Sequence, residues 1–113
     1  NLFGDIITDL GAALQGGLGM APSANLHPGR TSMFEPVHGS APPLAGKNVA
    51  NPMGAVLSAA LMLDFLGLAE QARALEAAVE RAVIKRQGTT DIGGTLGTRE
   101  TGDVIAALIR SAA

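Results

Sequence analysis

Phe-Glu-Pro-Val-His-Gly-Ser-Ala-Pro-Pro-Leu-Ala-Gly-Lys-Asn-Val-Ala-Asn-Pro, residues 34–52, is the stretch that decides how this chain folds. It holds four of the six prolines. A prolyl ring fixes φ near −65° and removes an N–H donor, so the stretch cannot continue a helix or a central strand. A long loop without regular structure is often a binding loop. The residues alone leave a second interpretation open, a proline-rich surface connector.

The composition excludes several classes of protein. Hydrophobic residues make up 47% of the 113 positions but aromatic residues only 3%, so any core is aliphatic. The net charge of −2 argues against nucleic acid or an acidic membrane as partners. Without cysteine, disulfides and thiolate metal sites are excluded. No targeting segment and no apolar run of about 20 residues is visible, so we expect a cytoplasmic protein of at most one domain.

Hydrophobic spacing and turn residues predict four helices and two short strands. The chain begins at Asn1, an N-cap candidate, directly on a helical pattern, which suggests the tail of something longer. Asn51 followed by Pro52 is a second helix start, and Thr98 is a candidate cap for the last helix. The predicted helices cover residues 2–14, 52–66, 68–86 and from 98 onward, and the predicted strands cover 20–26 and 31–37.

Each predicted helix has a characteristic face. Asp5 and Asp9 lie four residues apart on the first helix, so their carboxylates are neighbours, either on a solvated face or at a metal. The helix over 52–66 is apolar nearly all round and should be buried on most sides. The predicted core-facing residues of the third helix are Leu68, Ala72, Leu75, Val79 and Val83. Those of the last helix are Val104, Ile105, Leu108 and Ile109.

The stretch Glu-Pro-Val-His-Gly-Ser-Ala-Pro, with Ala-Gly-Lys and Ala-Asn-Pro after it, resembles the nucleotide-binding loop of the metal-dependent decarboxylating dehydrogenases. That family acts on 2-hydroxy acids and includes isopropylmalate, isocitrate, tartrate and D-malate dehydrogenases. Asn-Leu-Phe-Gly-Asp-Ile-Ile-Thr-Asp-Leu, residues 1–10, resembles the family's metal helix. The resemblance extends over nearly the whole chain. It implies the C-terminal part of an α/β isocitrate/isopropylmalate dehydrogenase-like fold, with helices packed on an incomplete sheet.

The resemblance also implies the site residues. Asp5 and Asp9 would bind Mg²⁺ or Mn²⁺, with a further aspartate coming from a partner subunit. The residues expected to contact NAD are Leu18, Gly19, Glu35, His38, Gly39, Ser40, Ala41, Pro43, Leu44, Asn51 and Asp91, with Thr90 as a weaker candidate. The family's substrate-binding arginines and its catalytic tyrosine and lysine belong to upstream segments. We therefore expect no catalytic residue within these 113 residues, and no dehydrogenase activity from them alone.

By the same resemblance, residues 1–15 would end the dimer-forming domain and residues 16–113 would belong to the nucleotide-binding domain. The expected protein is a homodimer acting on a small 2-hydroxy acid, with 3-isopropylmalate as the first expectation and tartrate or D-malate as the alternative. Two other interpretations stay open, a non-catalytic nucleotide-binding remnant and a Mg²⁺-dependent phosphoryl-transfer protein, although no P-loop supports the second.

Position 43 departs from the family's pattern. NAD-using members carry an aspartate after the Ala-Pro of the loop, and NADP-using members carry a lysine followed by tyrosine, whereas this chain has Pro43 and Leu44. The aspartate hydrogen-bonds the ribose and repels a 2′-phosphate. We expect a preference for NAD with weak affinity and poor discrimination against NADP.

Overall fold

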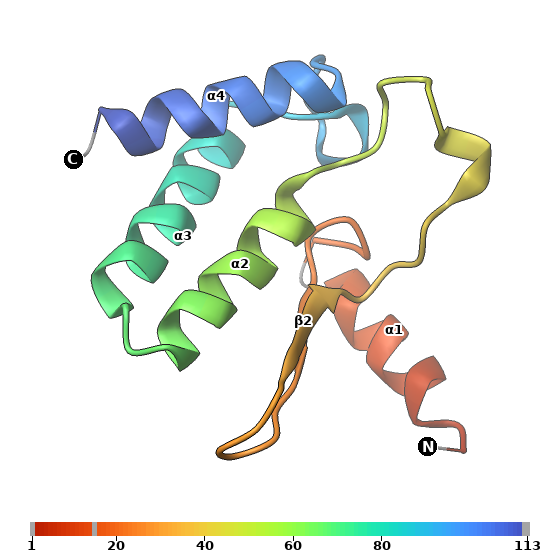
Figure 1. Ribbon diagram of the computed structural model, residues 1–113. Helices are drawn as coiled ribbons and strands as arrows, with labels where there is room; N and C mark the ends of the chain where they lie inside the picture. The colour runs from red at the N-terminus through yellow and green to blue at the C-terminus, as the bar shows by residue number, and fades with distance from the viewer. Residues whose placement is uncertain (1, 15, 112–113) are drawn as a thin grey trace.

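The computed structural model describes residues 2–14 and 16–111, apart from the Asp5 side chain (Figure 1). The expected number of helices and strands is confirmed within these ranges. In chain order the elements are α1 (Gly4–Leu14), β1 (Pro22–Asn25), β2 (Met33–Pro36), α2 (Met53–Phe65), α3 (Ala69–Ile84) and α4 (Thr98–Arg110). Two short 3₁₀ turns, η1 (Pro42–Leu44) and η2 (Thr90–Ile92), lie in the loops before α2 and α4. The expected cap Asn1 lies outside the described residues.

The two strands form an antiparallel hairpin that packs on α2. Ser23 pairs with Glu35 and Ala24 with Phe34 across the hairpin. The Phe34 ring meets the Phe65 ring of α2 at a centroid distance of 5.7 Å and an interplanar angle of 52°, a tilted arrangement that aromatic pairs favour. The described strands therefore form a two-stranded sheet that is covered on one face by α2 (Figure 1).

The core lies where α2, α3 and α4 meet. Met53 at the start of α2 is fully buried and packs with Ala78, Val79 and Ala82 of α3 and Ile105 of α4. The alanines let the helices approach closely, and α4 lies across the upper end of α3 in Figure 1. Val104, Leu108 and Ile109 flank this cluster, so the expected inner face of α4 is confirmed. Because Met53 directly follows the proline-rich loop, the core anchors that loop at its C-terminal end.

The burial expected for α2 and α3 is wrong at their outer turns. Gly54, Ser58 and Ala60 of α2 are buried, but Met62 and Phe65 are 38% and 44% exposed. Leu68, directly before the first residue of α3, and Val83, in its last turn, are also exposed. Helical periodicity fixes which face a residue occupies but not whether another element covers it.

Helix α1 extends away from the three-helix core (Figure 1). It begins at Gly4, two residues later than expected, and Ala12 is its one buried residue among those described. The large apolar side chains Leu2, Phe3, Ile6, Ile7, Leu10 and Leu14 are all exposed. Within the described residues, no helix has the length and apolar character needed to cross a membrane.

The proline-rich stretch connects β2 to α2 as a wide arc, as its prolines predict (Figure 1). Apart from the last residues of β2 and the turn η1, it contains no regular structure. It ends where Asn51 Oδ1 accepts a hydrogen bond of 2.9 Å from the Met53 N–H. That bond is the one expected of a capping asparagine, although the helix itself begins at Met53, with Pro52 already in helical conformation.

Candidate functional site

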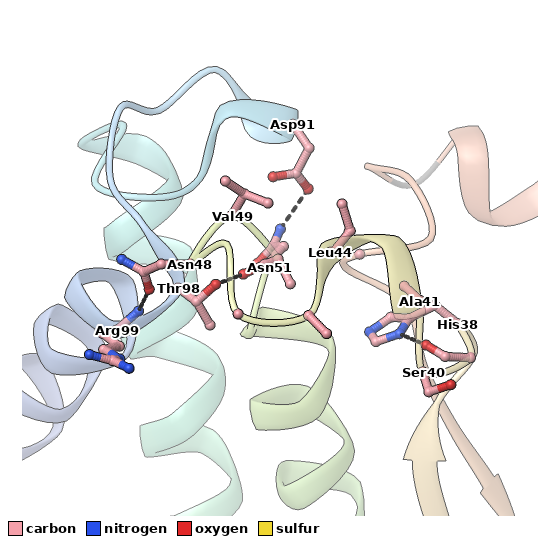
Figure 2. Close-up of a pocket in the computed structure, with 15 residues that line it drawn as sticks. His38, Ser40, Ala41, Leu44, Asn48, Val49, Asn51, Asp91, Thr98 and Arg99 are labelled. Atoms are coloured by element: carbon pink, nitrogen blue, oxygen red, sulfur yellow. Dashed lines mark hydrogen bonds between the residues drawn. The ribbon is translucent and has the colours of Figure 1, made fainter.

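A cavity of about 550 Å³ lies between the proline-rich loop and the loop that precedes α4 (Figure 2). This volume is within the usual range of about 300–1,000 Å³ for small-molecule sites. The lining is mostly backbone and small side chains, with Asp91 and Arg99 as its charged residues among those described. The lining residues are Gly19, His38, Gly39, Ser40, Ala41, Leu44, Ala45, Gly46, Asn48, Val49, Ala50, Asn51, Asp91, Thr98 and Arg99.

Asn51 joins the three segments that form the floor of the cavity. Its Oδ1 accepts from the Met53 N–H of α2, and its Nδ2 donates to Asp91 Oδ2 at 3.0 Å. The other Asp91 oxygen accepts a hydrogen bond from the Thr89 hydroxyl. Gly19 lies against both side chains, and its carbonyl accepts from the Gly54 N–H at 2.9 Å. The Asn51 side chain thus positions the cavity wall with bonds that are already made within the protein.

His38 presents one ring nitrogen that is free of the loop. Its Nδ1 lies 2.9 Å from the Gly39 carbonyl oxygen (Figure 2). Since a carbonyl oxygen only accepts, Nδ1 carries the proton in this hydrogen bond. In the neutral ring Nε2 is then an acceptor, and it suits a ligand hydroxyl or amino group.

Backbone strain concentrates in the loop that lines the cavity. Ala41 has φ +44° and Asn48 has φ +56°, and these are two of the four non-glycine residues with positive φ in the described part of the chain. The left-handed conformation costs a residue with a Cβ about 1–2 kcal/mol. Such outliers gather at ligand sites, where the surrounding structure holds them.

The start of α4 is fastened to this loop. The Thr98 hydroxyl donates to the Ala50 carbonyl at 2.6 Å, and Asn48 Oδ1 accepts from the Arg99 N–H at 3.0 Å. The expectation that Thr98 caps α4 is therefore wrong, because its hydroxyl is used across the cavity wall and an asparagine 51 residues earlier accepts the free N–H instead. The backbone amide of Glu100 itself, followed by the Asn48 side-chain amide, lowers the pKa of the Glu100 carboxyl.

Most of the expected nucleotide contacts meet in this cavity. Eight residues predicted from the sequence line it: Gly19, His38, Gly39, Ser40, Ala41, Leu44, Asn51 and Asp91. Three predicted contacts, Leu18, Glu35 and Pro43, do not line it. Glu35 is paired in the hairpin opposite Ser23, and Leu18 is exposed beside Gly19. Of the η1 residues, Leu44 lines the cavity and Pro43 does not. The weaker candidate Thr90 does not line it either.

Sequence reasoning missed the lining residues that lie on either side of the α4 junction. These are Ala45, Gly46, Asn48, Val49, Ala50, Thr98 and Arg99. Asparagine in a glycine-rich segment signals a left-handed turn, but nothing in the sequence says which distant helix such a turn meets.

The two expected metal ligands lie on α1, away from this cavity. Asp5 and Asp9 are one helical turn apart, and the Asp9 side chain is exposed. Among the side chains that the structure describes, no group of three or more histidines or carboxylates gathers as a metal site.

A sequence profile of the isocitrate/isopropylmalate dehydrogenase family matches residues 1–107. The chain belongs to this family. It is 49% identical to a 3-isopropylmalate dehydrogenase of Archaeoglobus fulgidus over 109 residues, which are 96% of the chain and 33% of that protein. It is 51% identical to a tartrate dehydrogenase/decarboxylase of Pseudomonas putida over 113 residues, covering 94% of the chain and 31% of that protein.

The fold agrees with this family. The crystal structure of an isocitrate dehydrogenase from Methylococcus capsulatus superposes with a TM-score of 0.89 at 42% identity, over 97% of the chain and 33% of that protein. The chain therefore spans about a third of the length of the decarboxylating dehydrogenases that it matches. The predicted fold class, a partial α/β dehydrogenase fold, is confirmed.

We predict that Gly19→Ala disturbs the cavity floor. A Cβ at position 19 would lie 2.9 Å from Asp91 Oδ2 and 3.2 Å from Asn51 Cβ, while the bond to Gly54 holds the residue from the other side. We expect urea unfolding to show a loss of about 1–3 kcal/mol, the usual cost of overpacking. Gly102→Ala on α4 is the matched control, because its Cβ would meet no atom within 4 Å. An unchanged stability of Gly19→Ala would contradict the close packing at this point.

Proposed function

We propose that this chain is the C-terminal third of a decarboxylating dehydrogenase that oxidises a 2-hydroxy acid with NAD and Mg²⁺ or Mn²⁺. The observation that carries the proposal is the cavity, because the stretch that resembles the family's nucleotide loop forms most of its lining. When bound, NAD would accept a hydride, and the metal would act as a Lewis acid on the substrate's oxygens.

The lining residues suit the adenosine half of a dinucleotide. His38 Nε2 would accept a hydrogen bond from a ribose hydroxyl or from the adenine amino group. The backbone of Gly39 and Ser40 is open to a ligand, because small residues there let its N–H groups approach closely. Asp91 has free lone pairs on both oxygens beyond the bonds to Asn51 and Thr89. Leu44 and Val49 would contact the apolar face of a base.

Asp5 and Asp9 would supply some of the ligands of the metal ion. Carboxylates one turn apart on a helix can supply the one or two protein ligands that Mg²⁺ usually takes. The remaining ligands would come from substrate, water and an aspartate of a second subunit, as in the resemblance. The domain assignment belongs to the same proposal: residues 1–15 in a dimer-forming domain and 16–113 in the nucleotide-binding domain. The exposed apolar side chains of α1 support this assignment and the homodimer that we propose.

The first substrate that we propose is 3-isopropylmalate, with the protein in the cytoplasm. A tartrate or D-malate substrate is the second candidate, and the relative named tartrate dehydrogenase/decarboxylase, at 51% identity, supports it. The two candidates share the oxidation and decarboxylation chemistry. A nucleotide-binding remnant without activity would differ from both, since it would bind NAD and turn over no substrate.

We predict that residues 1–113 complete an active enzyme when joined to the upstream part of the Archaeoglobus 3-isopropylmalate dehydrogenase. This hybrid should reduce NAD with 3-isopropylmalate and Mn²⁺, and Asp9→Asn should lower kcat/KM at least about a hundredfold, because metal stabilisation contributes several kcal/mol. Steady-state absorbance of NADH measures both rates.

Asp103→Asn on α4 is the control, because it also removes one exposed carboxylate from a helix. It should leave the rate of the hybrid unchanged. A hybrid that folds as a dimer but stays inactive, or that works equally well in EDTA, would contradict the proposed enzyme.

We predict that Pro43→Asp raises the preference of the hybrid for NAD over NADP by roughly tenfold or more. By the resemblance, a carboxylate at position 43, next to the lining residue Leu44, would gain a charged hydrogen bond to ribose, which is worth about 1.5–3 kcal/mol, and would repel a 2′-phosphate. In the present chain, Arg99 is the lining cation and Asp91, in the loop before α4, is the lining carboxylate. Among the described lining residues, the proline-rich loop itself contributes no carboxylate that would oppose a phosphate.

Pro43→Ala is the control, since it removes the ring without adding charge. The measurement is the ratio of kcat/KM for the two cofactors in all three proteins. A strong NADP preference in the unmodified hybrid, or a ratio that Pro43→Asp leaves unchanged, would refute this role for position 43.

A further inference from the structure

Asn48 bonds to α4 at three points. Its backbone carbonyl accepts from the Thr98 N–H at 3.1 Å, and its Oδ1 accepts from the Arg99 N–H at 3.0 Å. Its Nδ2 donates to Glu100 Oε2 at 2.9 Å. Both ends of one side-chain amide are thus used on the first turn of a helix that lies about fifty residues later in the chain. Figure 2 shows the bond of the oxygen end to Arg99.

We propose that Asn48, paired with Glu100, is a positioning residue that holds the cavity open for the nucleotide. We refer to this pair of residues as the Asn48–Glu100 clamp. The inference rests on the proposed nucleotide binding, and it assigns to Asn48 a role in affinity that does not require contact with the ligand.

The geometry around the clamp requires these residue types. Asn48 has φ +56°, a left-handed conformation that asparagine adopts more readily than most residues. Gly97 leaves room for it, because a Cβ at position 97 would collide with Asn48 Nδ2 and Glu100 Oε2. The first N–H groups of a helix lack partners within the helix, and Asn48 satisfies two of those of α4 from outside.

The clamp acts on the cavity because Asn48 and the two residues that precede Glu100 line it. Asn48 lies on one wall, and Thr98 and Arg99 lie on the adjoining wall. The Thr98–Ala50 hydrogen bond joins the same two walls two residues farther along the loop. If the Asn48 amide is lost, the bonds to Arg99 and Glu100 go with it, and the loop over residues 45–50 can move away from α4.

Reversing donor and acceptor tests the clamp. Asn48→Asp keeps an acceptor for the Arg99 N–H but puts a carboxylate against Glu100. Glu100→Gln keeps an acceptor oxygen for Asn48. In the double variant, the amide introduced at position 100 can donate to the carboxylate introduced at position 48, so the hydrogen bond returns with its direction reversed.

The measurement is NAD binding by calorimetry to the hybrid enzyme, in which residues 1–113 are joined to the Archaeoglobus upstream part, together with urea unfolding of each variant. We expect Asn48→Asp to weaken NAD binding at least about fivefold, about the value of one hydrogen bond. Glu100→Gln should stay within about twofold of the unmodified hybrid, and the double variant should return to that range. Asn48→Gly keeps the left-handed backbone and should weaken binding as Asn48→Asp does.

The outcomes separate the clamp from the proposed function. If the unmodified hybrid does not bind NAD, the proposed function fails, while the coupling between positions 48 and 100 in unfolding still tests the clamp. If the hybrid binds NAD and both Asn48 variants bind equally well, the positioning role is overturned. If both variants lose affinity and the double variant does not regain it, the pairing with Glu100 is overturned.

Discussion

The hydrogen bonds of the Asn51 side chain are the constraint on which the candidate site depends. The Asn51 side-chain amide accepts a hydrogen bond from the Met53 N–H at the end of the proline-rich loop and donates one to Asp91. Gly19 packs against the Asn51 and Asp91 side chains. Met53, two residues later, is the fully buried centre of the three-helix core. A loop that its prolines exclude from helix and sheet is thereby fixed to the buried three-helix core. Asn48 and Thr98 then fasten the same loop to α4.

Local chemistry made much of this predictable from the sequence. Prolines marked the loop, an asparagine before a proline marked the start of α2, and hydrophobic spacing gave the helices to within a few residues. The motif resemblance brought together eight residues that do line one cavity. These features depend on residues that are close in the chain, where residue type limits the backbone directly.

Features that join distant segments could not be predicted. Thr98 resembled a cap, but its partner is the Ala50 carbonyl, 48 residues away. Met62 and Phe65 follow an apolar pattern that predicts burial, yet the described part of the chain supplies no element to cover them fully. Pro43 and Leu44 are adjacent in the motif, but only Leu44 faces the cavity, and this depends on the orientation of one 3₁₀ turn. The assignment of Asp5 and Asp9 to a metal remains a prediction.

The most direct test of the nucleotide site is an amide NMR titration of the ¹⁵N-labelled chain with NAD. The account predicts shifts for Gly39, Ser40, Gly46 and Asn51, which line the cavity, while Glu76 on the outer face of α3 stays unchanged. Adenosine diphosphate ribose should shift the same amides, because the adenosine half is the part that the cavity suits. Shifts confined to α1 or to the hairpin, or none at millimolar NAD, would contradict the assignment of this cavity to a nucleotide.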